Sequence, residues 1–456
     1  MNAVQKTFAP GRRAAFTGAA RLTLIACSLG LGFGAGNNRL SGQEFEREPI
    51  NYSSATPDNC ISRLQKRMDA GDVRLKHDED FGYLPAVMQA LSVPESSQSL
   101  VFSKTSFQRH RIAPRTPRAL YFNDEVYVGF CQYGDVVEIS AVDPQLGTVF
   151  YSLDQEAKDQ PRFLRHNDTC LLCHGGSQTQ GVPGHLVRSV YSDTGGFPIL
   201  SGGTHLVNHT SPLTKRWGGW YVTGTHGDQA HLGNLIVTSK QVPNDIDNRA
   251  GLNVTNLAKF FDCSTYLTPH SDIVALLVLE HQTEAQNLLI RASFVTRQAL
   301  HQEAALNRDL NESQDKRWNS TTVRIKDVGD ALVKYLLFSG ETALTSRIQG
   351  TSSFTADFPK RGPRDRQGRS LRDFDLERRI FKYPCSYLIY SPSFDAIPTE
   401  TRDYVYHRLW DILTGKDTSP DFAHLSATDR QTIREILIDT KPGLPDEWRI
   451  DDTAKP

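Results

Sequence analysis

Several features are scarce in this sequence, and each absence narrows its function. The 51 basic and 52 acidic side chains nearly cancel, so the charge balance predicts neither nucleic acid nor an anionic membrane as the main partner. Seven cysteines are too few for a disulfide scaffold. Only three methionines are present, and none follows Met88. A metal site that needs a methionine sulfur from the later part of the chain is therefore excluded.

Long apolar runs are also scarce, and the most prominent one lies near the start. Residues 22–36 read LTLIACSLGLGFGAG and follow a basic stretch, with no acidic residue before Glu44. This pattern predicts a secretory signal over residues 1–36, and the run is short for a membrane-spanning helix. An uncleaved membrane anchor, lipidation at Cys27 and twin-arginine export are alternatives. We expect export to the periplasm or to the outer face of a bacterial cytoplasmic membrane.

The most informative motif is Cys170-Leu171-Leu172-Cys173-His174. C-x-x-C-H is the attachment signature of c-type haem. The thiols of Cys170 and Cys173 form thioether links to the porphyrin, and His174 becomes the proximal iron ligand. The spacing suits this chemistry, because one tight turn must reach both the porphyrin edge and the iron. The motif therefore predicts one covalently attached haem c.

Two other readings use the same residues. A zinc site could use both thiolates and His174, but structural zinc usually has four ligands, often from a second paired motif, and no second C-x-x-C exists here. A thioredoxin-like redox pair would be expected near a strand-helix-strand pattern, whereas these flanks are polar and glycine-rich. The remaining cysteines either form up to two disulfides or are buried as small apolar residues. They are Cys60, Cys131, Cys263 and Cys385.

The sixth iron ligand decides the function. Met68 and Met88 lie on apolar helical stripes, which favours core packing. His226 and His231 are the leading distal candidates, because they lie in the stretch RWGGWYVTGTHGDQAHLGN, where glycines allow close approach of the backbone. For either residue, an ordinary structural histidine is the alternative. Two further histidines are weaker candidates: His185 and His281.

The predicted fold class is α+β, with a cytochrome-c-like haem-binding region, a preceding antiparallel β segment and C-terminal helices. Short β-branched and aromatic segments within residues 99–155, separated by turn signals, predict the sheet. Ser271 or Asp272, and Ser426 with Asp429, are expected to cap helices. Helical periodicity predicts the following helices: residues 59–92, 272–300, 325–338, 400–414 and 427–439.

The expected domain organisation follows from composition. It comprises an N-terminal signal or anchor (1–36), a disordered lead (37–58), a haem-binding α+β domain (59–344), an exposed loop or linker (345–378) and a C-terminal helical segment packed on the main domain (379–456). Within the sheet segment, RHRIAPRTPR could bind haem propionates or an acidic partner, or it is a solvated basic loop. Its arginines are Arg109, Arg111, Arg115 and Arg118.

Six stretches carry a resemblance: VFSKTSFQ, ALYFNDEVYVGF, CLLCHGG, GVPGHLVRSV, RWGGWYVTGTHG and RIFKYPCSYLIYSPSFDAIP. From about residue 80 onwards, the chain resembles a family of large exported proteins of planctomycetes and related bacteria that have a single cytochrome-c-type haem site. The resemblance implies haem, export and overall class, and it implies nothing about a substrate. Only Cys170, Cys173 and His174 match motif positions.

Two functions follow from these expectations. With a six-coordinate iron, the protein is an electron carrier whose partners are other redox proteins. With an open distal position, it is a haem enzyme or ligand binder of the peroxidase type, in which His226 moves a peroxide proton and Arg188 stabilises developing charge. A haem-based sensor is a third reading. We favour electron transfer, because no peroxidase motif is present.

Overall fold

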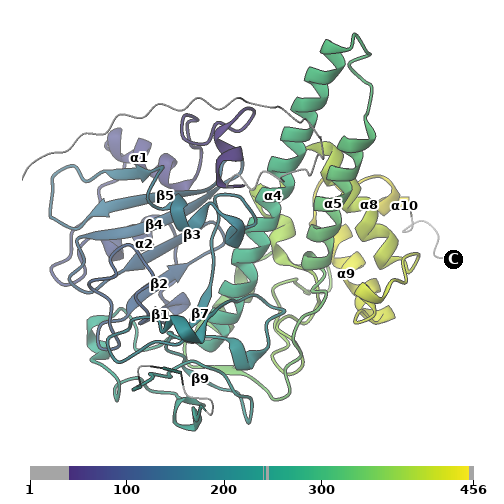
Figure 1. The fold of residues 1–456 in the computed structure, drawn as a ribbon. Helices are drawn as coiled ribbons and strands as arrows, with labels where there is room; N and C mark the ends of the chain where they lie inside the picture. Colours follow the sequence, from purple (N-terminus) through teal and green to yellow (C-terminus); the bar gives the residue numbers. More distant parts are fainter. Residues whose placement is uncertain (1–40, 240, 243–245, 451–456) are drawn as a thin grey trace, which may run out of the picture. The chain divides into compact units, whose positions relative to one another are not determined.

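The computed structural model describes residues 41–239, 241–242 and 246–450. The predicted signal or anchor, with its lipidation and export signals, lies outside these residues. The described residues belong to one compact unit, Leu40–Pro456, drawn in Figure 1. Within them, no helix combines the length and the apolar character needed to cross a membrane.

A six-stranded antiparallel sheet forms the first half of the unit. An antiparallel sheet was predicted within residues 99–155, and the sixth strand lies beyond that range. Its strands follow chain order, so each pairs with the next along the sequence. The segment between the first two strands, which carries the arginine-rich stretch, is irregular. The strands are β1 (Ser99–Val101), β2 (Arg118–Phe122), β3 (Val126–Phe130), β4 (Val136–Asp143), β5 (Gly147–Asp154) and β6 (Phe163–His166).

One face of the sheet is covered by α1 (Cys60–Asp69) and α2 (Leu84–Ala90), which share an apolar core with it. The predicted continuous helix over residues 59–92 is therefore wrong, because α1 ends before Gly71, whose positive φ of 82° terminates it. The predicted disordered lead is also wrong from residue 44 onwards. Phe45, Ile50 and Tyr52 are buried in the same core, so this segment has enough apolar surface to pack.

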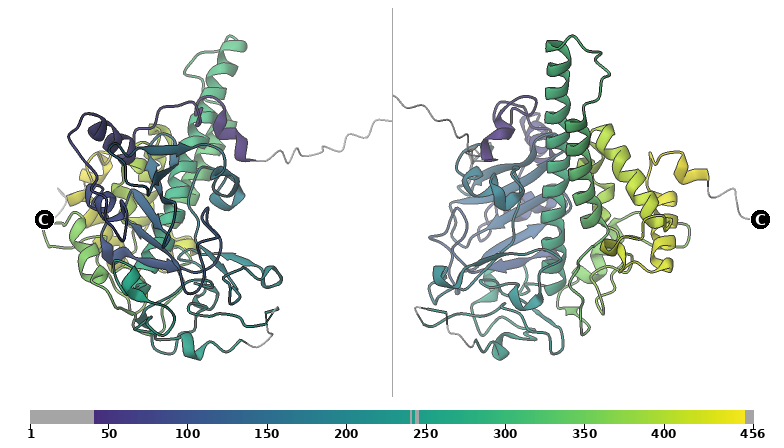
Figure 2. Two further views of the ribbon diagram at one scale, coloured as in Figure 1. Left: turned by 90° about the vertical axis from the view of Figure 1, so that its left-hand side faces the viewer. Right: turned by 45° about the vertical axis from the view of Figure 1, so that its right-hand side comes forward.

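The opposite face packs against the long helix α4 (Ile273–Asp309). Asp272 caps α4 as predicted, because its carboxylate accepts the N–H groups of residues 274 and 275 at 2.8 and 3.3 Å. The helix runs nine residues beyond the predicted end at 300. Figure 2 shows three layers: the sheet, then α4 with α5 (Asn319–Leu336), and then the last helices. The last helices are α8 (Thr399–Leu413) and α9 (Ala427–Thr440). The predicted capping box of Ser426 and Asp429 lies at the start of α9.

The segment 345–378 was expected to be an exposed loop or linker, and the structure corrects this. Its backbone is mostly irregular, but Ile348, Phe354, Phe358 and Leu371 are almost completely buried in the core around α4. The segment is rich in Ser, Thr, Gly, Pro and Arg, but it also contains these four large apolar side chains. Their burial stabilises the packed position of the segment despite its loop-like composition.

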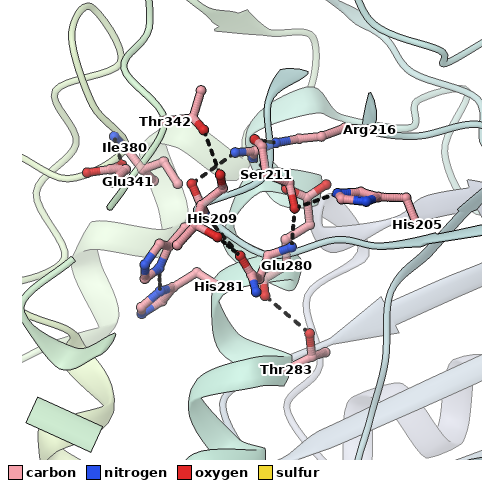
Figure 3. Close-up of polar contacts among 12 residues, drawn as sticks. His205, His209, Ser211, Arg216, Glu280, His281, Thr283, Glu341, Thr342 and Ile380 are labelled. Carbon is pink, nitrogen blue, oxygen red and sulfur yellow. Dashed lines mark hydrogen bonds and ion pairs between the residues drawn. The ribbon is translucent and has the colours of Figure 1, made fainter. Parts of the chain in front are cut away.

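A buried ion pair joins α4 to the loop segment that leads into Trp217. Arg216 Nη1 lies 2.7 Å from Glu280 Oε2, and both side chains are at most 1% exposed. The other guanidinium donors bind the backbone oxygens of Ser211 and His209 at 2.8 and 3.0 Å, as drawn in Figure 3. Burial raises the pKa of Glu280 to about 7, against the opposing effect of Arg216.

Replacing Glu280 with Gln would leave the Arg216 guanidinium buried without a counter-charge. At a pH well above 7, where Glu280 is ionised, we expect the free energy of unfolding to fall by about 3–5 kcal/mol, measured by urea denaturation. The matched control is Glu312→Gln, which breaks the part-exposed pair with Lys316 and should change stability by less than about 1 kcal/mol. Equal losses in the two variants would contradict a structural role for the buried pair.

Candidate functional site

The C-x-x-C-H motif forms a single helical turn directly after the edge strand β6. Cys170 is the first, capping residue of the short helix α3 (Leu171–His174), and the N–H of His174 binds the oxygen of Cys170 at 3.0 Å. The thiol of Cys170 is half-buried, and burial raises its pKa to about 11, whereas Cys173 is exposed. Both sulfurs and the imidazole therefore come from one turn, as the motif predicts.

The imidazole of His174 is oriented by a single hydrogen bond. Its Nδ1 lies 2.9 Å from the backbone oxygen of Gly184, which fixes Nδ1 as the donor and leaves the Nε2 lone pair available for a metal. The N–H of Gly184 in turn binds the oxygen of His174 at 2.9 Å. The ring packs on Phe150 of β5, with ring centroids 5.0 Å apart. A backbone acceptor on one ring nitrogen is the usual support for a metal-binding histidine.

The segment that holds His174 is itself held by α4. The buried amide of Asn287 accepts the N–H of His185 at 3.0 Å and donates to the oxygen of His185 at 2.7 Å. A Cβ at residue 184 would overlap the amide oxygen of Asn287, so only glycine fits there. We refer to Gly184, His185 and Asn287 as the backbone clamp. It fixes the oxygen that orients His174.

An ion pair lies on the sheet beside the turn. Arg118 of β2 and Glu138 of β4 are 2.7 Å apart, and the Arg118 guanidinium lies over Gly129, where a side chain would collide with it. Burial lowers the pKa of His174, and the nearby positive charges of Arg118 and Arg188 lower it further. Both arginines have a buried Nε without a hydrogen-bond partner. Of the four predicted arginines in the basic stretch, Arg118 is thus the one that approaches the motif.

Exposed apolar side chains surround the same turn. Leu172 lies between the two cysteines and is 83% exposed, and Leu164 of β6 is 62% exposed. Phe107, from the irregular segment before β2, is exposed and lies against the His166 ring, with centroids 6.2 Å apart. Apolar groups of this size gain free energy when a ligand covers them. Exposed apolar side chains are therefore present in the turn itself and on the strand that precedes it.

The two predicted distal candidates lie together, but they contact each other rather than the turn. His231 Nε2 and His226 Nε2 are 3.1 Å apart, and both rings are buried. The N–H of Asn253 donates to His226 Nε2 and the N–H of Gly233 donates to His231 Nδ1, each at 3.0 Å. These bonds occupy the lone pair of each ring, so neither has one left for iron.

The weaker candidates are also engaged. The nitrogens of His185 lie 2.7 and 3.3 Å from the hydroxyl oxygens of Ser140 and Thr148. His281 bonds His209 and Ser386 within the cluster of Figure 3. Met88 is buried in the core on the other face of the sheet, as the core-packing interpretation predicts, and Met68 is partly buried against the same core.

The cysteines outside the motif are free thiols, so no disulfide joins the described cysteines. Within the described ranges, no group of three or more His, Cys, Asp or Glu side chains is arranged to hold a metal ion. The zinc alternative thus gains no support.

Comparison with family models, with curated proteins and with solved structures finds no match to this chain.

Four residues at the turn were not predicted from sequence: Phe150, His166, Gly184 and Asn287. Gly184 stands in the GVPGHLVRSV stretch, where the glycine and proline content indicated irregular backbone near the porphyrin. Phe150 and Asn287 carry no local signal, because their contacts link residues far apart in the chain. His166 and Cys170 are only four residues apart, and this closeness was the one available hint.

Replacing Gly184 with Ala should disrupt the backbone clamp. The added Cβ would overlap the Asn287 amide, so we expect a loss of about 1–3 kcal/mol in the free energy of unfolding, measured by thermal denaturation. The matched control is Gly176→Ala in the same turn, where a Cβ would meet nothing within 4 Å and the effect should stay within about 0.5 kcal/mol. A harmless Gly184 variant would show that the clamp tolerates a side chain.

The buried histidine pair should make folding sensitive to acid. Burial, with a smaller effect of His226, lowers the pKa of His231 to about 3, whereas an unfolded histidine titrates near pH 6.5. The stabilisation that comes from burying neutral His231 is therefore fully present above pH 6.5. It is lost as the pH falls towards 3, at up to about 1.4 kcal/mol per pH unit. His231→Gln should flatten this slope in urea titrations. Equal slopes in the wild type and the variant would contradict the assignment.

Proposed function

We propose that this protein is an exported c-type cytochrome that carries one covalently attached haem and transfers electrons to or from redox partner proteins. The observation that carries the proposal is the hydrogen bond from His174 Nδ1 to the Gly184 oxygen at 2.9 Å. It leaves Nε2 of the motif histidine available as an iron ligand, one residue after a cysteine that is open to solvent.

The surroundings of the motif favour a porphyrin over a single metal ion. A zinc ion would need further nitrogen, sulfur or oxygen ligands, whereas the groups next to the turn are apolar and exposed, as in Leu164 and Leu172. Their burial under a macrocycle would contribute roughly 25 cal/mol per Å² of covered apolar surface. The same surface would be an unusual environment for a hydrated or open metal site.

Charged groups near the motif suit the acidic part of a haem. Arg118 and Arg188 both act electrostatically on His174, and each retains a buried donor without a partner. Guanidinium groups pair with carboxylates through parallel hydrogen bonds, so these arginines would hold the propionates. The role proposed for Arg188 in peroxide chemistry is thereby replaced by one in cofactor binding.

The bound haem would supply one-electron chemistry. The chain's own contribution is to attach the porphyrin through Cys170 and Cys173, to orient the His174 ring through the backbone clamp, and to leave the Cys173 side of the turn open to a partner. A peroxidase-type function is less well supported, because it requires a distal base. The predicted base, His226, has its described contacts in a separate pair with His231.

Covalent attachment is directly testable. When the chain is expressed with a bacterial haem-ligation system, we expect haem to remain with it after denaturation and extraction with acidified organic solvent. The Cys170→Ser/Cys173→Ser double variant should release all haem on extraction, because no thioether can form. Cys263→Ser, which removes a free and half-buried thiol outside the motif, should retain it. A colourless wild-type protein, or one that binds stoichiometric zinc instead, would overturn the proposal.

A further inference from the structure

His166 lies at the end of the edge strand of the sheet, four residues before Cys170. It ends β6, and its backbone is paired directly with Phe150 of β5. Directly opposite residues in an antiparallel pair project their side chains to the same face. Phe150 also packs on the His174 ring at 5.0 Å. Phe150 is thus paired in register with His166 and also packs on the His174 ring, which links the strand and the helical turn.

The imidazole of His166 has a nitrogen to offer. Its Nε2 lies 2.8 Å from the hydroxyl oxygen of Ser152, and Nδ1 has no hydrogen bond to the described residues. The side chain is only half-buried, with the exposed Phe107 ring against it. A hydroxyl that both donates and accepts can release a ring nitrogen at small cost, since water replaces it.

The other potential ligands are committed elsewhere. His185 is almost completely buried and both of its ring nitrogens bond hydroxyl groups, which water could not reach to replace. The lone pairs of His226 and His231 accept backbone N–H groups. The methionines that the structure describes pack on the opposite face of the sheet. Among the remaining histidines, His110 is exposed and pairs with Asp135, next to the start of β4, at 3.8 Å.

We propose that His166 supplies the second axial nitrogen to the iron, an inference that rests on the proposed haem function. If Nε2 of His166 bound the iron, it would give up its hydrogen bond to the Ser152 hydroxyl, which water could then take over. The chain would thereby hold a bis-histidine, six-coordinate iron. That coordination closes the site to small ligands and fits an electron carrier rather than a peroxidase-type enzyme.

The test compares wild type, His166→Ala and the matched control His110→Ala, all expressed with the haem-ligation system. Covalent haem is first quantified in each denatured protein. Absorption and electron paramagnetic resonance spectra of the folded proteins then report the spin state, and carbon monoxide is added to the reduced forms. We expect wild type and His110→Ala to be low-spin and unreactive. His166→Ala should be high-spin, should bind carbon monoxide stoichiometrically, and should return to low-spin when millimolar imidazole is added.

The outcomes separate the two proposals. Haem attached in all three proteins, with a low-spin His166→Ala variant or a high-spin wild type, would overturn the assignment of His166 and leave the haem function standing. If His110→Ala were high-spin and His166→Ala stayed low-spin, the ligand would be His110 and the assignment of His166 would be wrong. Absence of covalent haem from wild type would overturn the proposed function itself. Restoration by imidazole excludes misfolding as the cause of a high-spin His166→Ala spectrum.

Discussion

The candidate site depends on one amide. Asn287, buried on α4, makes two hydrogen bonds to the backbone of His185, and this fixes the neighbouring carbonyl that orients His174. A loop so rich in glycine and proline has many alternative conformations, and two bonds from a rigid helix select one of them. The orientation of the motif histidine is therefore set by a residue more than a hundred positions away.

Helix α4 serves both halves of the described unit for the same reason. Toward the sheet, it presents Gln282 and Gln286, which bond the Tyr127 hydroxyl at 2.7 Å each. Away from the sheet, it carries Glu280 and His281 into the cluster of Figure 3. A helix that carries polar side chains at selected positions can be buried on several sides when those side chains find hydrogen-bond partners, as Gln282 and Gln286 do here. Its position thus constrains the sheet and the last helices together.

Sequence reasoning predicted the parts of this molecule that depend on local pattern. Alternation and turn residues located the antiparallel sheet, periodicity and caps located α4 and α9, and the C-x-x-C-H motif located the turn. Reasoning from sequence did not succeed where tertiary contacts decide the outcome. Phe354 and Phe358 were hidden in a loop-like composition. His226 and His231 stood out in a glycine-rich stretch, yet they satisfy each other, and no local pattern could show that Gly184 must accommodate the Asn287 amide.

The outer strand of the sheet has a consequence for how the chain behaves in crowded surroundings. β6 has only four residues, and its Arg165 is anchored to the backbone oxygens of Tyr52 and Ala55 at 2.6 and 2.8 Å. An edge strand this short offers few free backbone hydrogen-bonding groups to another polypeptide, which protects the sheet from edge-to-edge aggregation. Before any ligand covers Leu164 and Leu172, the protein can therefore expose them at that border without self-association through β-strand addition.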